Sequence, residues 1–297
     1  MAVIGWIGLG HMGGPMTANL VKSGHSVRGF DLNAEALDAA VADGVTRATS
    51  IKDAVSGAEV VFTMLPKGEH ARAVYFGEAG VFANADPKTL LVESSTIDVE
   101  SSQALHDAAK VAGFRLVDAP VSGGITGAAA GTLTFMVGGE ADAVADATTY
   151  IQPMAANIIP TGGATTGQAA KICNNLMLFI NLAATSEGAV LADRLGLDPQ
   201  VFWDIASVSS GDSWALRTWY PIEGVVPSAA VNRAFAPTFT SELANKDIGL
   251  AIAAADATDT PLEIGKHVAQ LFQRLVDQGQ GSKDCSMIVK LVDGTLA

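Results

Sequence analysis

Short apolar runs alternate with amphipathic stretches along the first half of the chain. Residues 2–7, 25–30 and 59–64 are apolar runs of strand length, and Gly24 stops a helical pattern that lies between the first two. An alternation of strands and helices is typical of a parallel sheet with helices on both faces. The same pattern predicts strands at 89–93, 114–117, 132–137 and 157–160, and helices at 33–43, 98–112 and 141–151.

The pattern changes after the polar, glycine-rich segment 161–167. Residues 168–195 contain no proline and carry apolar side chains on almost every side, which predicts a long buried helix of roughly 40 Å. Beyond it we expect only helices and one irregular stretch. The helices are predicted at 198–207, 240–257, 261–278 and 284–291, and the irregular stretch at 209–237.

These two patterns predict two domains, residues 1–163 and 164–297, joined by the long helix at about 168–195. The predicted fold class is α/β: an N-terminal doubly wound sheet of the Rossmann type is followed by an all-α C-terminal domain. Segment 161–167 is expected to be a flexible polar joint between them.

The composition indicates a compact globular protein and excludes several classes of partner. Hydrophobic residues make up 49% of the 297 residues, charged residues 16%, and the formal net charge is −13. Such a field repels nucleic acid and anionic membranes. We expect no signal peptide, no membrane span, and a cytoplasmic location in which Cys173 and Cys285 are two buried free thiols. A small anionic ligand would need locally placed donors.

The first predicted strand runs into a glycine-rich turn. Gly8, Gly10 and Gly13 form a G-x-G-x-x-G pattern between a strand and a helix, which is the context of a dinucleotide-binding turn. Asp31 ends the second predicted strand, where an acid binds the ribose hydroxyls and repels a 2′-phosphate, so NAD is favoured over NADP. The alternative is a chance glycine turn followed by a capping Asp. The candidate cofactor residues of the turn are Gly8, Leu9, Gly10, His11, Met12 and Gly13.

Three further loops follow predicted parallel strands. Ligands of doubly wound sheets bind beyond the carboxyl ends of the strands, so these loops are candidate ligand contacts. Ser122-Gly123-Gly124 is either an ordinary turn or a concavity of backbone N–H groups, with one hydroxyl, that holds a carboxylate. The other two loops contain Leu65 with Pro66, and Thr96.

Lys171, Asn174 and Asn175 interrupt the apolar pattern of the long helix. Spacings of three and four place them on one face of a helix. A buried lysine flanked by two amides is costly unless this face lines a polar cleft. The alternative is a solvated lysine near the start of a helix.

Taken together, the chain resembles the β-hydroxyacid dehydrogenase family over nearly its full length. The resemblance rests on GWIGLGHMGGPMTANLVKSGH near the N-terminus, on SSTID and DAPVSGG with GTLTFMVGGE, and on GQAAKICNN at the start of the long helix. It implies Lys171 as the general acid/base and Asn175 as its substrate-binding neighbour. One departure is Thr165, where the family usually has glycine.

The resemblance also implies further contacts. Ser122, Gly123 and Gly124 would hold the substrate carboxylate, with Asn174 and Trp214 as weaker candidates. Leu65, Pro66, Thr96 and Lys246 would border the NAD. Neither the spacing nor the resemblance predicts a metal.

The expected reaction is the NAD-dependent oxidation of 3-hydroxyisobutyrate to methylmalonate semialdehyde, with an alkaline optimum because the base must be deprotonated. L-Serine oxidation or tartronate semialdehyde reduction is the nearest alternative, and a non-catalytic NAD sensor is a remote one. Imine-reducing relatives usually replace the lysine. The amount of apolar helix surface suggests a homodimer or homotetramer.

Overall fold

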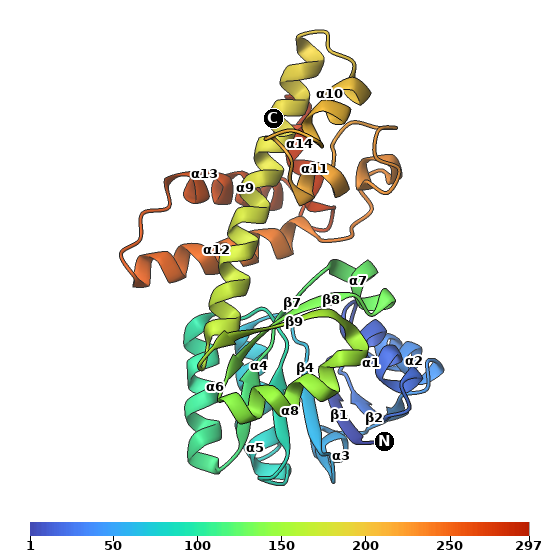
Figure 1. The fold of residues 1–297 in the computed structure, drawn as a ribbon, viewed down its shortest axis with the longest axis vertical. Helices are drawn as coiled ribbons and strands as arrows, with labels where there is room; N and C mark the ends of the chain where they lie inside the picture. The colour runs from blue at the N-terminus through green and yellow to red at the C-terminus, as the bar shows by residue number, and fades with distance from the viewer. Residues whose placement is uncertain (297) are drawn as a thin grey trace. The chain divides into compact units, whose positions relative to one another are not determined.

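The computed structural model describes residues 1–296. The chain forms two compact units, Met1–Lys171 and Ile172–Ala297 (Figure 1). Every strand lies in the first unit, and the described residues of the second unit form helices, turns and loops, with one isolated β-bridge between Thr240 and Asp284. The predicted fold class, a doubly wound sheet followed by an all-helical domain, is therefore confirmed.

The first unit is built on a nine-stranded sheet with the strand order β3-β2-β1-β4-β5-β6-β8-β7 and β9 paired with β8. The chain goes outward from β1 in one direction and then returns to its other side, which defines a switch point between β1 and β4. The first six strands are mutually parallel. They are β1 (Val3–Ile7), β2 (Ser26–Phe30), β3 (Thr46–Arg47), β4 (Val60–Thr63), β5 (Leu90–Glu93) and β6 (Arg115–Asp118).

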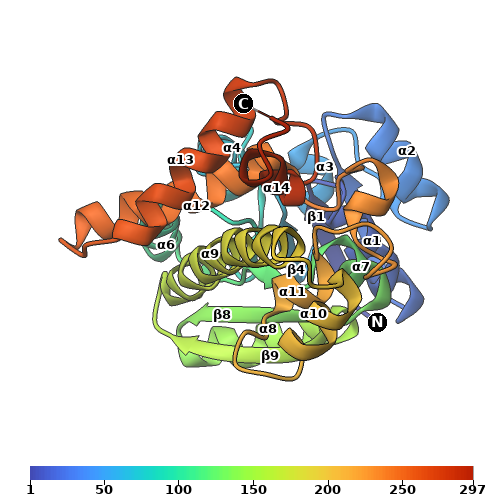
Figure 2. The same ribbon diagram turned by 90° about the horizontal axis from the view of Figure 1, so that it is seen from above.

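The last three strands correct the expectation of a purely parallel sheet. Strand β8 (Leu133–Gly139) is antiparallel to β6 and to β7 (Val121–Ser122), and parallel to β9 (Ala155–Gly162). Figure 2 shows β8 and β9 side by side. Strand β9 includes the first two residues of the predicted joint 161–167, so that joint is shorter than the sequence suggested.

Both faces of the sheet are buried, which explains the almost continuous apolar runs of its strands. Along β4, Val60 and Phe62 pack into one core cluster and Val61 into another on the opposite face. The helices of this unit are α1 (Gly13–Lys22), α2 (Ala34–Ala42), α3 (Ile51–Val55), α4 (Gly68–Tyr75), α5 (Val81–Asn84), α6 (Val99–Ala112), α7 (Gly124–Ala130), α8 (Ala141–Ile151) and the 3-10 helix η1 (Gln152–Met154).

Several of these helices begin where the sequence places a capping side chain. Asn33 accepts a hydrogen bond from Ala36 N–H at α2, and Asp98 accepts one from Ser101 N–H at α6. The short elements β3, β7, α3, α4, α5 and α7 were not predicted. They have too few residues for a clear period and depend on packing against the sheet.

The second unit is a helical domain. Helices α12 (Ser241–Ala257) and α13 (Glu263–Asp277) pack side by side, as Figures 1 and 2 show. The region 209–237 is not wholly irregular as expected, because it contains α11 (Trp214–Thr218) and the 3-10 helix η2 (Ala230–Arg233). The remaining helices are α10 (Pro199–Ala206), η3 (Cys285–Ile288) and α14 (Val289–Val292).

Helix α9 (Thr166–Arg194) contains the apolar stretch identified in the sequence. The expectation of burial on all sides is wrong, since Met177 and Leu191 are exposed. Helix α9 is long and apolar enough to cross a membrane by length and composition alone, which does not contradict the expectation of no membrane span. A core helix of a soluble protein passes the same test, and 44% of the most apolar window of α9 is buried inside the protein.

The two cysteines are free, but only Cys285 is buried. Cys173 lies on the exposed side of α9, so the prediction of two buried thiols holds for one of them. Burial raises the pKa of the Cys285 thiol well above its usual value, which keeps that group protonated.

Candidate functional site

The carboxyl ends of the parallel strands bring most of the predicted loops to one edge of the sheet. Strands β2, β1, β4, β5 and β6 are neighbours in that order and run in the same direction. Gly8 follows β1, Asp31 follows β2, Leu65 lies just beyond β4, and Thr96 just beyond β5. This edge contains the switch point, where doubly wound sheets bind their ligands.

The glycine turn has the geometry that the sequence pattern requires. Gly8 has φ +95°, and a Cβ there would lie 2.2 Å from the carbonyl oxygen of Met64. A Cβ on Gly13 would lie 2.0 Å from the Gly8 carbonyl oxygen, so only glycine lets α1 pack this closely on the turn. A Cβ on Gly10, by contrast, would point into open space. The turn is therefore closed on the sheet side and open where a pyrophosphate would approach the backbone.

The Trp6 side chain supports this turn from below. Its indole N–H donates to the Gly8 carbonyl oxygen at 2.8 Å, and its ring stacks on Phe62 with centroids 5.0 Å apart. Trp6 is fully buried in the core of the first unit. The indole thus holds the carbonyl group of Gly8, the residue of the turn that has a positive φ.

The Asp31 carboxylate accepts hydrogen bonds from two backbone N–H groups, one in the glycine turn and one just after Asp31. Leu9 N–H donates to Oδ2 at 2.6 Å, and Asn33 N–H donates to Oδ1 at 2.7 Å. The carboxylate is only partly buried. It is therefore oriented beside the glycine turn and still able to accept hydrogen bonds from a diol, as the ribose of NAD requires. The residues present fit a dinucleotide, with His11 exposed and Met12 half-buried between the glycines.

A buried polar chain lies under the loops that follow β4 and β5. The Leu65 N–H donates to the Ser95 hydroxyl at 2.7 Å, and Ser95 N–H donates to Glu93 Oε1 at 2.7 Å. The Thr63 hydroxyl donates to the other oxygen of Glu93. Burial raises the pKa of Glu93 to about 7, against the lowering effect of these hydrogen bonds. Glu93 could not be recognised from the sequence, because it looks like the polar end of an apolar strand.

Ser122-Gly123-Gly124 is not a free loop. Ser122 belongs to β7 and pairs with Thr134 of β8, while Gly124 begins α7. Gly123 and Gly124 have φ values of +133° and +63°, so the chain reverses there through conformations that favour glycine. The structure thus explains both glycines by backbone geometry, and their role toward a substrate carboxylate stays a prediction.

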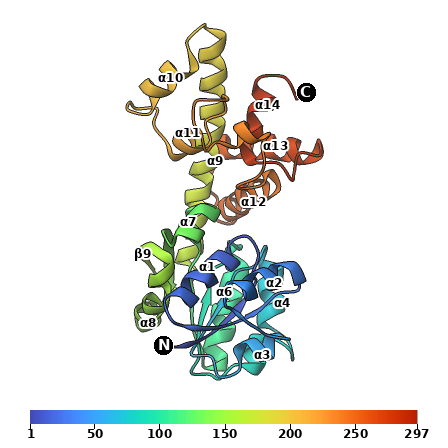
Figure 3. The same cartoon turned by 90° about the vertical axis from the view of Figure 1, so that its right-hand side faces the viewer.

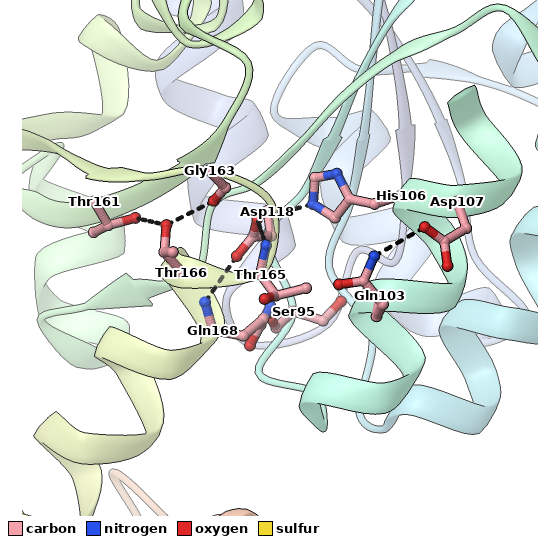
Figure 4. A network of polar contacts seen from close by, with 10 residues as sticks. All are labelled: Ser95, Gln103, His106, Asp107, Asp118, Thr161, Gly163, Thr165, Thr166 and Gln168. Atoms are coloured by element: carbon pink, nitrogen blue, oxygen red, sulfur yellow. Dashed lines mark hydrogen bonds and ion pairs between the residues drawn. The ribbon is translucent and has the colours of Figure 1, made fainter.

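Lys171 lies near the start of α9, and 8% of its surface is exposed. One turn before it, Gln168 is fully buried and joins two parts of the sheet edge. Its side-chain amide donates to the Ser95 carbonyl oxygen at 2.7 Å, and its side-chain oxygen accepts from Ile97 N–H at 3.1 Å. Its backbone N–H donates to Asp118 Oδ2 at 2.8 Å (Figure 4). The loop that contains Thr96 and the helix that contains Lys171 are therefore directly connected.

In the second unit, Asp247 links two predicted site residues. The side-chain amide of Asn175 donates to Asp247 Oδ2 at 2.7 Å, and the Lys246 ammonium lies 2.9 Å from Asp247 Oδ1. Asn174 in turn donates to Asn175 Oδ1 at 3.1 Å. Sequence analysis noted Asp247 only as the neighbour of Lys246. Asp247 is buried in α12, and its contacts with Asn175 and Lys246 account for an acidic residue at a buried position of that helix.

Trp214 is the predicted site residue of the region 209–237. It begins α11, is 50% exposed, and contacts Trp219 edge-to-face with ring centroids 4.9 Å apart. A half-exposed aromatic ring is compatible with a pocket wall, although the Trp219 contact alone explains its placement. No group of three or more His, Cys, Asp or Glu side chains that could hold a metal occurs among residues 1–296.

The glycine turn, the acid after β2 and the doubly wound sheet together define a dinucleotide-binding protein of the Rossmann type. Comparison with known proteins agrees. Residues 3–163 match a family model described as the NAD-binding domain of 6-phosphogluconate dehydrogenase. Residues 165–292 match one described as NAD-binding of NADP-dependent 3-hydroxyisobutyrate dehydrogenase. The chain belongs to the β-hydroxyacid dehydrogenase family.

Individual relatives match over almost their entire length. An NAD-dependent L-serine dehydrogenase of Pseudomonas aeruginosa is 42% identical over 295 residues, 99% of each chain. A 3-hydroxyisobutyrate dehydrogenase of the same organism is 43% identical over 296 residues, again 99% of each. A solved structure of Mycobacterium tuberculosis 3-hydroxyisobutyrate dehydrogenase with L-serine has a TM-score of 0.91 at 42% identity, and the match covers 98% of this chain and 99% of that one.

Proposed function

We propose that the enzyme oxidises 3-hydroxyisobutyrate to methylmalonate semialdehyde with NAD⁺, and that Lys171 is the general acid/base. The observation that supports this most is a lysine buried near the start of a largely apolar helix, one turn beyond Gln168, which is hydrogen-bonded to the loop after β5 and to Asp118. A lysine amine held in a largely buried position at the edge of the sheet where ligands bind is a candidate acid/base group.

Bound NAD⁺ supplies the acceptor for the hydride that leaves the carbinol carbon. The neutral amine of Lys171 takes the hydroxyl proton, and in the reverse direction the ammonium returns it to the aldehyde oxygen. Asn175, four residues further along α9, binds the substrate from the same face of the helix. Its side-chain amide is oriented by Asp247. The N–H groups and hydroxyl at Ser122-Gly123-Gly124 hold the substrate carboxylate.

L-Serine is the second candidate substrate, because one relative with 42% identity is named as an L-serine dehydrogenase and another was solved with L-serine. The two substrates are short 3-hydroxy acids that differ at the carbon next to the carboxylate. Serine carries an ammonium there and 3-hydroxyisobutyrate a methyl group. A pocket that excludes an unpaired charge would favour the methyl group.

The deciding experiment is the initial rate at alkaline pH with NAD⁺ or NADP⁺ and a panel of 3-hydroxyisobutyrate, L-serine, 3-hydroxypropionate and glycerate. We expect the highest kcat/KM with 3-hydroxyisobutyrate and NAD⁺. A higher kcat/KM with L-serine would reassign the substrate and leave the mechanism in place. If none of the four is oxidised although NAD⁺ binds tightly, the proposed function is wrong.

Asp31 provides a separate test of the cofactor assignment. Replacing Asp31 with Ala removes a charged acceptor from the ribose hydroxyls and the repulsion of a 2′-phosphate. We expect the preference for NAD⁺ over NADP⁺ to fall about 10- to 100-fold, as the loss of a hydrogen bond to a charged group implies. The matched control is Asp43→Ala, at the exposed end of α2. Unchanged selectivity in Asp31→Ala would rule out its ribose role.

A further inference from the structure

The first turn of α9 is capped by a side chain that comes from the sheet. The N-terminal N–H groups of a helix have no partners within the helix. Here Asp118, the last residue of β6, accepts from Gln168 N–H at 2.8 Å through Oδ2 and from Thr165 N–H at 2.9 Å through Oδ1. These two bonds attach the start of the helix to the carboxyl end of a central strand (Figure 4).

Thr165 has an unusual conformation at this point. Its φ is +68°, in the left-handed region that β-branched residues avoid. The helix resumes regular bonding immediately afterwards, since Ala169 N–H donates to the Thr165 carbonyl oxygen at 3.0 Å. Such a conformation persists only where surrounding contacts hold it, and the Asp118 bond to Thr165 N–H is one of them.

His106 completes the environment of the Asp118 carboxylate. Its Nε2 lies 2.9 Å from Asp118 Oδ1, and it projects from α6 on the other side of the carboxylate from α9. Asp118 is fully buried and only 10% of the His106 side chain is exposed. Each carboxylate oxygen therefore has at least one donor, and the N–H groups of Thr165 and Gln168 are backbone donors at the start of α9.

The packing leaves this helix start very little freedom. A Cβ on Gly167 would lie 2.5 Å from the Asp118 carbonyl oxygen and 2.6 Å from that of Met136. A Cβ on Gly138 would lie 2.7 Å from Gly167 N. The first turn of α9 therefore lies directly against the backbones of β6 and β8, and a small shift of Asp118 would move it.

We propose that Asp118, supported by His106, is a positioning residue that sets the start and the rotation of α9 and thereby the place of the Lys171 amine. Lys171 follows Gln168 by three residues, so it lies one turn further on the same side of the helix. Any rotation of the first turn carries the amine with it. This inference rests on the proposed role of Lys171 as the acid/base.

The test compares Asp118→Asn with Asp284→Asn. Asp284 is an equally buried aspartate that accepts backbone N–H bonds from Thr238, Phe239 and Ser286, but it lies in the second unit and has no role in the proposed chemistry. For each variant, kcat is expressed per NAD-binding site, and KM, the NAD dissociation constant and Tm are measured. Hydrogen exchange of the peptide 163–172 is measured in parallel.

We expect Asp118→Asn to lower kcat by about 10- to 100-fold, because small misplacements of a catalytic group have effects of this size. KM and NAD binding should change less than about 2-fold, and exchange in 163–172 should rise. Asp284→Asn should lower Tm without either change. If Asp118→Asn lowers Tm but leaves kcat per site and exchange in 163–172 as in wild type, Asp118 is merely structural and the proposal is wrong.

His106 supplies a second pair of variants in case Asp118→Asn does not fold. His106→Gln keeps a side-chain donor toward Asp118 and should retain most of kcat, whereas His106→Leu removes it and should lower kcat. Equal kcat in the two variants would overturn the supporting role of His106. If wild-type enzyme oxidises none of the four acids, the proposed function fails, and the exchange data alone then decide whether Asp118 holds the helix start.

Discussion

The two ends of α9 come from one apolar stretch of sequence, yet their surroundings differ sharply. At the start, Gln168 and Lys171 are polar and buried, and donors and acceptors from the sheet surround Gln168. At the other end, Leu191 is exposed, and Leu195 just beyond the helix is 77% exposed. Polar groups are thus enclosed where chemistry is expected, and apolar groups are open to solvent where none is.

Helix α10 continues the exposed apolar surface. Helix α10 lies beside the end of α9 (Figure 3). Val201 and Ile205 are spaced by four, which places them on one side of α10, and both are exposed. Val208, two residues beyond the helix, is exposed as well. Isolated exposed apolar residues are normal, but a series on one side of a helix indicates an interaction surface. We propose that the start of α9 serves catalysis and that its end, with α10, serves assembly.

The largest effect is expected at the start of α9. Lys171→Ala should lower kcat by about 10²- to 10⁴-fold, the typical contribution of a general acid/base, and leave NAD binding within about 2-fold. Lys171→Arg should be equally inactive, because arginine keeps the charge but cannot act as a base. Lys266→Ala, at an exposed ion pair of α13, is the control. Steady-state kinetics and NAD titration measure both quantities, and lost NAD binding would mean that Lys171 is structural.

The next largest effect is expected at the other end of α9, where α10 follows. We propose that the enzyme is a homo-oligomer that buries the exposed side of α10. Ile205→Glu should place a charge in that interface and reduce the mass measured by light scattering toward the 30.4 kDa of one chain. Glu263→Lys, on the exposed first turn of α13, should leave the mass unchanged. A wild-type protein that already has the mass of a single chain would contradict the proposal.

A smaller effect concerns Glu93, which lies under the loops at the sheet edge and should make the free energy of unfolding depend on pH. The pKa of Glu93 is raised from 4.5 to about 7 in the folded protein, so the folded state binds more protons than the unfolded state between these values. Stability should therefore fall as pH rises from about 4.5 to 7, by about 3 kcal/mol from this group. Denaturant unfolding of Glu93→Gln should lack that decline, while Glu100→Gln, exposed on α6, should keep it. Parallel curves for wild type and Glu93→Gln would reject the assignment.

The smallest effect is expected where β9 passes into α9. Thr165→Gly removes a β-branched side chain from a left-handed conformation, a relief of about 1–2 kcal/mol, and adds about 0.5–1 kcal/mol of backbone entropy cost. A net gain of about 1 kcal/mol or less should raise Tm. Thr165→Ala keeps a Cβ and should be less stable than the glycine variant. A glycine variant less stable than wild type would show that the Thr165 side chain contributes more than its strain costs.

Much of the fold could be predicted because strand and helix periods are local properties. The runs that became β1, β4 and β5 are apolar except for the last residues of β4 and β5, Thr63 and Glu93, and caps such as Asp98 mark their helices directly. A strand was predicted where β8 lies, but its antiparallel direction could not be predicted. Strand direction depends on how the chain crosses over between strands, which no local pattern records. Exposure along α9 failed for a related reason, since an apolar side chain looks the same whether a core or a partner covers it.

The site residues also differ in whether a local sequence pattern predicts them. Gly8, Gly13 and Asp31 were predictable because a turn motif fixes their spacing, and their geometry agrees with that motif. Asp118, Gln168 and Asp247 were missed as functional residues because their partners are far apart in sequence, 50 residues for Asp118 and Gln168 and 72 for Asn175 and Asp247. Only a fold brings such pairs together. The structure therefore adds the hydrogen bonds between residues that are distant in the sequence.

The hydrogen bond from Trp6 to the glycine turn has an optical consequence. Trp6 is the only tryptophan among residues 1–171, since the other three are Trp203, Trp214 and Trp219. Its indole is shielded from water and donates a hydrogen bond to the Gly8 carbonyl oxygen of the glycine turn. Emission from this ring should respond when a ligand reorganises the turn. The difference in fluorescence between wild type and Trp6→Phe would then isolate a built-in reporter for cofactor occupancy, readable without a label and without turnover.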